Sequence, residues 1–147
     1  MVAIRIGFVS RREEESVLLA ERLMDEIESW NSGVQILADG DLALTIGRPP
    51  SSVQEMERLK VDFIVSIGGD GTILRTIHKM ADPVPILGIN MGTLGFLVDV
   101  EPADALETIK RLLSGFVVDE RSRLKLLLNG VCMPRATNEI AFLTASP

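Results

Sequence analysis

Apolar residues in the first two-thirds of the chain alternate between two spacings. Short apolar runs at 4–9, 34–38 and 61–67 predict β-strands, and segments with a helical spacing follow the first and third runs. Ser10 and Glu13 form a capping-box pattern that predicts the start of the first helix. We expect one face of that helix to lie in the core, with the residues Val17, Ala20, Leu23, Met24, Ile27 and Trp30.

Segment 39–50 is predicted to be a loop, because Pro49 and Pro50 forbid a helix there. A short helix follows, capped by Ser51 or Ser52, and segment 83–89 supplies a fourth strand. Strands that alternate with helices predict a parallel sheet covered on both faces. Residues 1–100 are therefore expected to form a Rossmann-like α/β domain.

Beyond residue 100 the pattern changes. Pro102 begins an amphipathic helix that ends at Gly115, and only strands are predicted after it. The predicted strands are 116–118, 124–128, 131–133 and 136–143, with a hairpin turn at Asn129-Gly130. We interpret residues 101–147 as a helix and the beginning of an all-β domain. These few strands cannot cover their own apolar faces, so we expect a longer protein or a second chain to complete them.

The run Gly68-Gly69-Asp70-Gly71-Thr72 lies between a fully apolar strand and a helix. Free amides at the start of a helix suit a phosphate, and glycines let the backbone approach it closely. A carboxylate such as Asp70 is repelled by that phosphate unless it binds a metal, accepts a hydroxyl hydrogen bond or removes the hydroxyl's proton. We interpret the pattern as phosphoryl transfer to an alcohol, with Asp70 as general base and Thr72 as helix cap. The alternative is a tight turn in which Asp70 only binds nearby amides.

Composition narrows the class of protein. The chain has 147 residues and a net charge of −6, which argues against a nucleic-acid partner. One cysteine and one histidine exclude a disulfide framework and a zinc site. No run is long enough to span a membrane and no signal peptide is visible, so we expect a cytoplasmic protein without a membrane partner.

Three segments resemble the NAD kinase family, which phosphorylates the 2′-hydroxyl of NAD's adenosine ribose with ATP or, in some members, polyphosphate. They are the 68–72 run, the loop 88–97 (sequence GINMGTLGFL) and the triplet Thr137-Asn138-Glu139. Their order and spacing match the family over nearly the whole chain. The 68–72 run alone is less specific, since diacylglycerol and sphingosine kinases carry a similar one.

The resemblance implies roles for individual residues. Asp70 would accept the proton of the 2′-hydroxyl, while Gly71 would bring its amide to the dinucleotide. Phe96 would pack against the adenine, although a core phenylalanine is the alternative, and Asn138 and Glu139 would hold the nucleoside. Arg75 would face the pyrophosphate, or else be an ordinary exposed helix residue. The remaining residues assigned to nucleotide binding are Gly69, Thr72, Asn90 and Gly92.

The family also implies cofactors and partners. No protein metal site is visible, so Mg²⁺ or another divalent ion is expected to arrive with ATP. The family continues into a β-rich domain with a Gly-Ser/Thr-Thr-Ala-Tyr motif, which this chain lacks, so we expect it to retain a partial NAD site. A homo-oligomer is expected as well. Two other hypotheses stay open: a lipid or sphingoid-base kinase, which the acidic balance disfavours, and a non-catalytic nucleotide-binding module.

Overall fold

The computed structural model describes residues 3–92, 95–98 and 100–143. The chain divides into two compact units, Met1–Val117 and Val118–Pro147. The strands are β1 (Ile4–Ser10), β2 (Val34–Asp39), β3 (Pro50–Ser51), β4 (Phe63–Gly68), β5 (Ile86–Asn90), β6 (Leu127–Leu128) and β7 (Val131–Cys132). The helices are α1 (Glu14–Trp30), α2 (Gly40–Thr45), α3 (Val53–Arg58), α4 (Asp70–His78) and α5 (Ala105–Leu112), with a 3₁₀ turn at Pro102–Asp104.

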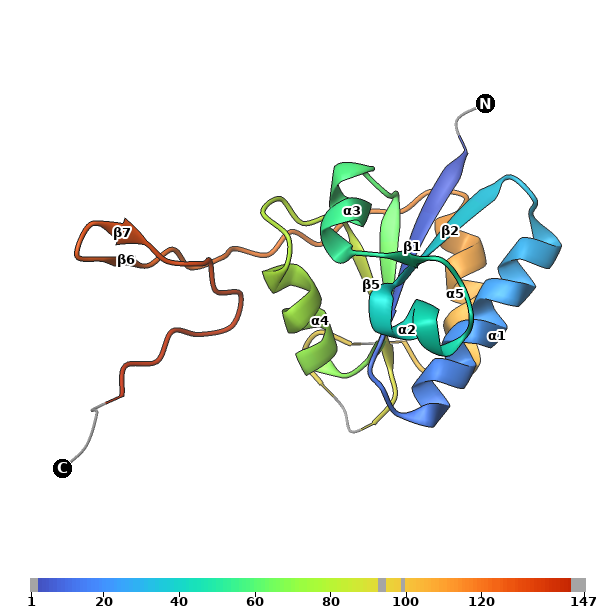
Figure 1. The fold of residues 1–147 in the computed structure, drawn as a ribbon, viewed down its shortest axis with the longest axis horizontal. Helices are drawn as coiled ribbons and strands as arrows, with labels where there is room; N and C mark the ends of the chain where they lie inside the picture. The colour runs from blue at the N-terminus through green and yellow to red at the C-terminus, as the bar shows by residue number, and fades with distance from the viewer. Residues whose placement is uncertain (1–2, 93–94, 99, 144–147) are drawn as a thin grey trace. The chain divides into compact units, whose positions relative to one another are not determined.

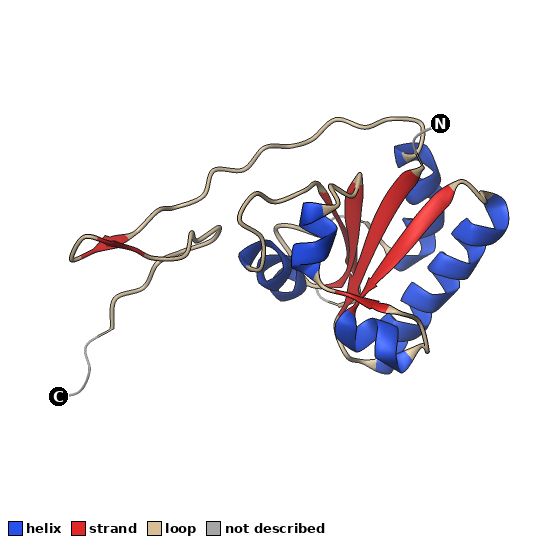
Figure 2. Ribbon diagram, turned by 45° about the horizontal axis from the view of Figure 1, so that its top comes forward, coloured by secondary structure: helices blue, strands red, loops and turns tan. Residues whose placement is uncertain are grey.

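A five-stranded parallel sheet forms the centre of the first unit (Figures 1 and 2). Its strand order is β3-β2-β1-β4-β5, and β1 pairs in register with β2 on one side and β4 on the other. The chain leaves β1 toward one edge of the sheet and leaves β4 toward the other. The loops after β1 and β4 therefore diverge, and such a switch point opens a crevice at the carboxyl ends of the strands. The predicted α/β fold is confirmed.

Helices cover both faces of this sheet because successive strand residues point to opposite sides. On one face, Phe8 and Phe63 pack against buried residues of α1 and α5 such as Leu23 and Ile109. On the other face, Ile64 packs with Val9 of β1, with residues of α3 and with Met80 beyond α4. Strand β4 is buried along its whole length, as its apolar sequence predicts.

Several local predictions are wrong. Helix α1 begins at Glu14 with no side-chain cap, and Ser10 is still part of β1, so the predicted capping box does not form. Trp30 is 52% exposed rather than buried, because it is the last residue of α1, where its ring lies beside Lys110. The loop predicted at 39–50 contains α2 and the first residue of β3. The cap of α3 is confirmed, since the Ser52 hydroxyl accepts a hydrogen bond from the Glu55 amide.

The boundary between the units lies later than residue 100. Ala105 and Ile109 of α5 are fully buried in the core of the first unit, so the predicted domain division after residue 100 falls inside that unit. Phe116 also belongs to the first unit, where its ring meets Phe63 edge-on at 5.8 Å. Among the described residues, no helix has the length and apolar character to cross a membrane.

The second unit contains a small antiparallel sheet of β6 and β7, which starts a second domain. The turn at Asn129-Gly130 is confirmed, and both residues have the positive φ that this hairpin turn requires, at 51° and 80°. The strands predicted at 116–118 and 136–143 are absent from the described residues. Within 124–128, Leu127 and Leu128 form β6, and Leu124 makes an isolated bridge to Ala136. A segment with alternating apolar residues forms a stable strand only when a neighbouring strand pairs with it.

Candidate functional site

The glycine turn, residues 68–72, joins β4 directly to α4. Gly69 is the N-cap residue and Asp70 the first helical residue, so the prediction that Thr72 caps the helix is wrong. Thr72 is instead buried in the first turn of α4, where its carbonyl accepts a hydrogen bond from the Thr76 hydroxyl at 2.8 Å. A Cβ on Gly68 would overlap the Thr72 hydroxyl. Glycine at position 68 therefore lets the start of α4 pack tightly on the strand end.

Asp70 joins the two glycine-rich loops. Its Oδ2 accepts a hydrogen bond from the Phe96 amide at 2.8 Å, and its Oδ1 accepts one from the Leu97 amide at 3.0 Å. A Cβ on Gly95 would lie 2.7 Å from the Asp70 Cγ, so glycine is required for this approach. Asp70 thus binds amides, as the turn alternative predicts, but they belong to a second loop far along the chain. Each oxygen keeps a second lone pair that can accept a hydroxyl.

The second loop begins at Asn90, the last residue of β5. Asn90 is buried, and its Oδ1 accepts a hydrogen bond from the Gly92 amide at 3.1 Å, so its side chain shapes the loop. Phe96 is 93% exposed, which excludes the alternative of a core phenylalanine and leaves its ring free to stack. Thr93 and Leu94 of the family-like segment lie outside the described residues.

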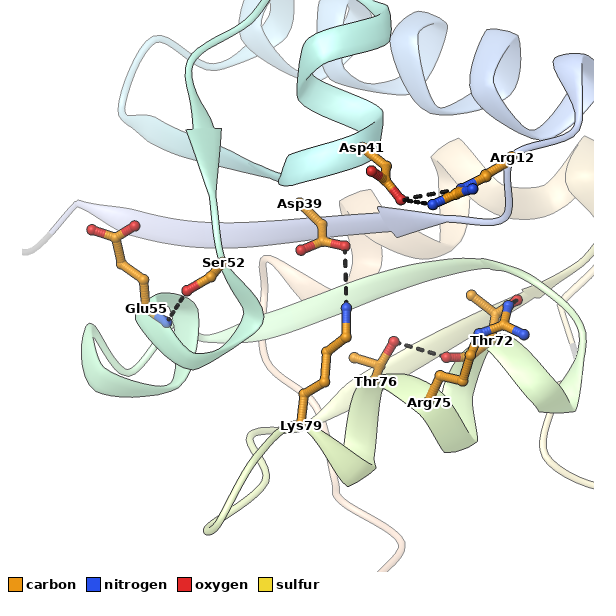
Figure 3. Close-up of polar contacts among 9 residues, drawn as sticks. All are labelled: Arg12, Asp39, Asp41, Ser52, Glu55, Thr72, Arg75, Thr76 and Lys79. Atoms are coloured by element: carbon orange, nitrogen blue, oxygen red, sulfur yellow. Dashed lines mark hydrogen bonds and ion pairs between the residues drawn. The ribbon is translucent and has the colours of Figure 1, made fainter.

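A cavity of about 480 Å³ opens beside α4 at the carboxyl ends of β1 and β2. It is lined along α4 by Thr72, Arg75, Thr76 and Lys79, which the close-up in Figure 3 shows with their neighbours. The charged residues in its wall are Arg11, Arg12, Arg75 and Lys79, against Glu13, Asp39 and Asp41. Four cations and three carboxylates give the cavity a small positive excess. It suits an anionic group with polar neighbours.

The pairing of these charges is uneven. Arg12 donates to Asp41 Oδ2 at 2.8 Å, whereas the Lys79 ammonium is 3.8 Å from Asp39, too far for a hydrogen bond (Figure 3). Arg75 is exposed, and within the described residues its guanidinium makes one long hydrogen bond, to the Thr72 hydroxyl at 3.5 Å. Arg75 is therefore available to a ligand.

Arg11 was not predicted as a site residue. It follows β1 directly, and its side chain donates to the Met91 carbonyl at 2.9 Å and to the Ser16 hydroxyl at 3.0 Å. Its backbone amide donates to the Ile67 carbonyl near the end of β4 at 3.0 Å. It therefore ties the loop after β1 to the loop after β5. The only signal in the sequence was a pair of arginines shortly after a predicted strand, and the contact could not be predicted because Arg11 and Met91 are 80 positions apart.

The structure brings together most of the predicted site residues on the first unit. Asp70 contacts the loop that carries Phe96, and Gly69, Gly71, Thr72 and Arg75 lie in the same turn and helix. Asn138 and Glu139 are exposed in the second unit. Their membership of the same site stays a prediction.

Comparison with known proteins identifies the family. Residues 6–117 match the ATP-NAD kinase N-terminal domain. The chain belongs to the NAD kinase family. It is 48% identical to the NAD kinase of Methanosarcina mazei over 143 residues, which cover 97% of this chain and 49% of that protein. It is 45% identical to the NAD kinase of Thermococcus gammatolerans over 148 residues, covering 98% of this chain and 52% of that protein. The chain thus spans about half the length of these curated relatives.

Two solved structures share the fold of this NAD kinase family chain. Yeast NADH kinase complexed with NADH superposes with a TM-score of 0.73 at 21% identity, over 85% of this chain and 42% of that one. An NAD kinase from Archaeoglobus fulgidus in complex with ATP gives a TM-score of 0.62 at 29% identity, over 88% of this chain and 45% of that one.

Proposed function

We propose that the protein carrying this chain transfers a phosphoryl group from ATP, or from polyphosphate, to the 2′-hydroxyl of the adenosine ribose of NAD, giving NADP. The observation that carries the proposal is the position of Asp70. It lies at the switch point of the sheet, at the start of α4, where two glycine-rich loops meet beside a cation-lined cavity. Membership of the NAD kinase family supports the same reaction.

On the acceptor side, Asp70 would be the general base and Phe96 the platform for adenine. The amides of Phe96 and Leu97 fix the Asp70 carboxylate, which reduces the reorganisation needed when a hydroxyl arrives. An exposed aromatic ring next to the fixed base offers a nucleoside both a stacking surface and a proton acceptor. Asn138 and Glu139 would add hydrogen bonds to the base or ribose from the second unit.

On the donor side, Arg75 and Arg11 would bind phosphates at the N-terminus of α4, whereas Lys79 follows the last residue of that helix and lies beside Asp39. The first amides of a helix have no intrahelical partner and carry partial positive charge, which reinforces these side chains. Mg²⁺ or another divalent ion would be carried by the donor phosphates. No group of three or more histidine, cysteine or acidic residues among the described residues could hold a metal, so the donor would supply most of its ligands.

The test is NADP formation from NAD, ATP and Mg²⁺, measured with an NADP-specific dehydrogenase. It would be run on this chain and on a fusion in which the C-terminal half of the M. mazei relative follows residue 147. Asp70→Asn should lower kcat of the active form by about 10²–10⁴-fold, the usual contribution of a general base. Asp82→Asn, an exposed carboxylate away from the cavity, is the matched control and should leave kcat unchanged.

An Asp70→Asn variant with parental kcat would contradict the base assignment. Saturable NAD binding without NADP formation by the fusion would instead favour a non-catalytic nucleotide-binding module. Replacing ATP with polyphosphate in the same assay tests the donor. Light scattering tests the predicted homo-oligomer, and the predicted cytoplasmic location is tested by fractionation of the source cells.

A further inference from the structure

Asp39 has a position in the cavity that the proposed reaction does not yet use. It is the last residue of β2, one residue beyond Ala38, which pairs with Phe8 of β1. Its side chain is 19% exposed and lines the cavity. Within the described part of the chain its carboxylate accepts no hydrogen bond, and the nearest cation, Lys79, is 3.8 Å away.

The neighbouring acid is engaged differently. Asp41 accepts two hydrogen bonds from Arg12, at 2.8 and 3.1 Å, and its side chain is 65% exposed (Figure 3). Its charge is therefore balanced by one partner. Both of these bonds go to Asp41 Oδ2, whereas in the described part of the chain neither oxygen of Asp39 accepts a hydrogen bond.

The glycine turn and Asp39 follow different strands, with Arg11 and Arg75 near the turn and Lys79 near Asp39. The glycine turn follows β4, and Arg11 and Arg75 both approach it, with the Arg75 Nη1 4.0 Å from the position of a Cβ on Gly71. Asp39 ends β2, which is separated from β4 by β1. Adjacent strands are about 4.8 Å apart, so Asp39 lies roughly 10 Å across the sheet from the turn. A donor with phosphates at the turn would present its other end to Asp39.

The chemistry of that other end decides which donor fits. A carboxylate with free oxygens repels the phosphates of an extended polyphosphate chain. It attracts the two hydroxyls of a ribose, which donate charge-assisted hydrogen bonds to its two oxygens. An acid at the end of the second strand has this use in other doubly wound sheets, where it binds ribose hydroxyls.

We propose that Asp39 binds the ribose hydroxyls of the phosphate donor, so that the chain selects a nucleoside triphosphate over polyphosphate. The proposal rests on the donor site of the proposed function and specifies the class of molecule that the site takes. Asp39 is then a specificity-determining residue that acts in binding and takes no part in proton transfer.

The experiment is calorimetric titration of this chain with three ligands in the presence of Mg²⁺: ATP, 2′,3′-dideoxy-ATP and inorganic triphosphate. Hydrogen bonds to a charged group contribute enough to predict that ATP binds about tenfold or more tightly than dideoxy-ATP. Asp39→Ala should remove that difference while keeping triphosphate binding. Asp41→Ala removes the same charge from the same cavity and should keep the preference for ATP.

Equal binding of ATP and dideoxy-ATP by the parent chain would overturn the proposal. Loss of binding of all three ligands in both Asp39→Ala and the isosteric Asp39→Asn would also overturn it, because Asp39 would then have a structural role. If neither ATP nor triphosphate binds to this chain or to the fusion used in the activity assay, the donor site itself is wrong and the proposed function fails with it. A clear ATP preference in a protein that forms no NADP would overturn the proposed function and leave the assignment of Asp39 standing.

Discussion

Two clusters of charged side chains on the first unit use the same residue types in opposite ways. In the first cluster, Arg48 donates to Glu28 at 2.7 and 3.0 Å and to Asp25 at 2.8 Å. Its hydrogen bonds to Glu28 lower the pKa of that carboxyl, and the same bonds raise the pKa of the Arg48 guanidinium. In the second cluster, at the cavity, Lys79 is 3.8 Å from its carboxylate and Arg75 makes only one long hydrogen bond within the described residues.

The difference follows from where each cluster lies. Arg48 comes just after α2 and its two partners are on α1, so the cluster fastens one helix to another. The cavity opens at the carboxyl ends of parallel strands, where connecting loops diverge, and its cations come from the loop after β1 and from α4 with its C-cap residue. Charged side chains that neutralise each other stabilise the fold, while charged side chains left underpaired at a sheet edge are available to a ligand. This contrast makes distinct predictions for the two clusters.

The largest effect is expected at Gly95, which controls the position of Asp70. In Gly95→Ala the new methyl group would lie where the Asp70 carboxylate now sits, so the carboxylate must move from the amides of Phe96 and Leu97. We expect kcat of the active fusion to fall by about 10²-fold, close to the loss of the base itself. Steady-state kinetics measure this. Gly40→Ala is the matched control, because nothing lies within 4 Å of the added Cβ. A parental kcat in Gly95→Ala would contradict the role of the close approach between Gly95 and Asp70.

A smaller effect is expected at the underpaired cation Arg75. Arg75→Met keeps much of the side-chain bulk and removes the charge, so we expect the KM for ATP to rise about tenfold while the free energy of unfolding stays within about 0.5 kcal/mol of the parent. The rise should shrink at high salt, which screens the phosphate attraction. The matched control is Arg111→Met on α5, an exposed arginine paired with Glu107 and outside the cavity wall. A large loss of stability with an unchanged KM would place Arg75 with the structural cluster.

The glycine turn and its helix could be predicted because their signals are local. An apolar strand, a glycine run and a helical spacing occur within about 20 residues, and the fold keeps that order from β4 to α4. The same holds for the hairpin turn at Asn129-Gly130. Such features need no knowledge of distant contacts.

Features that depend on distant contacts could not be predicted. The role of Arg11 arises only when the ends of β1 and β5 meet, and the hydrogen bonds of Asp70 to Phe96 and Leu97 need the same packing. Helix α2 was missed because it is six residues long and buries only Leu42 and Ala43, too few positions to establish a helical period. The strand predictions for the second unit are wrong for a different reason. Its alternation was visible, yet residues such as Leu124 and Phe142 remain exposed without a ladder to bury them.

The smallest effect is expected in the neutralised cluster. Arg48→Met should lower the free energy of unfolding by about 1 kcal/mol, the upper range for partly exposed ion pairs, and leave kcat and KM unchanged. Because the folded pKa of Glu28 is lowered, its stabilising contribution is complete above its ordinary pKa of 4.5 and disappears as pH falls through the lower folded value. The raised pKa of Arg48 adds no slope in this range, since that group stays charged. Denaturant unfolding from pH 7 down to about pH 3 measures this, and the free energies of unfolding of parent and variant should converge below pH 4.5. A constant difference at all pH values would mean that Arg48 stabilises the fold through packing rather than charge.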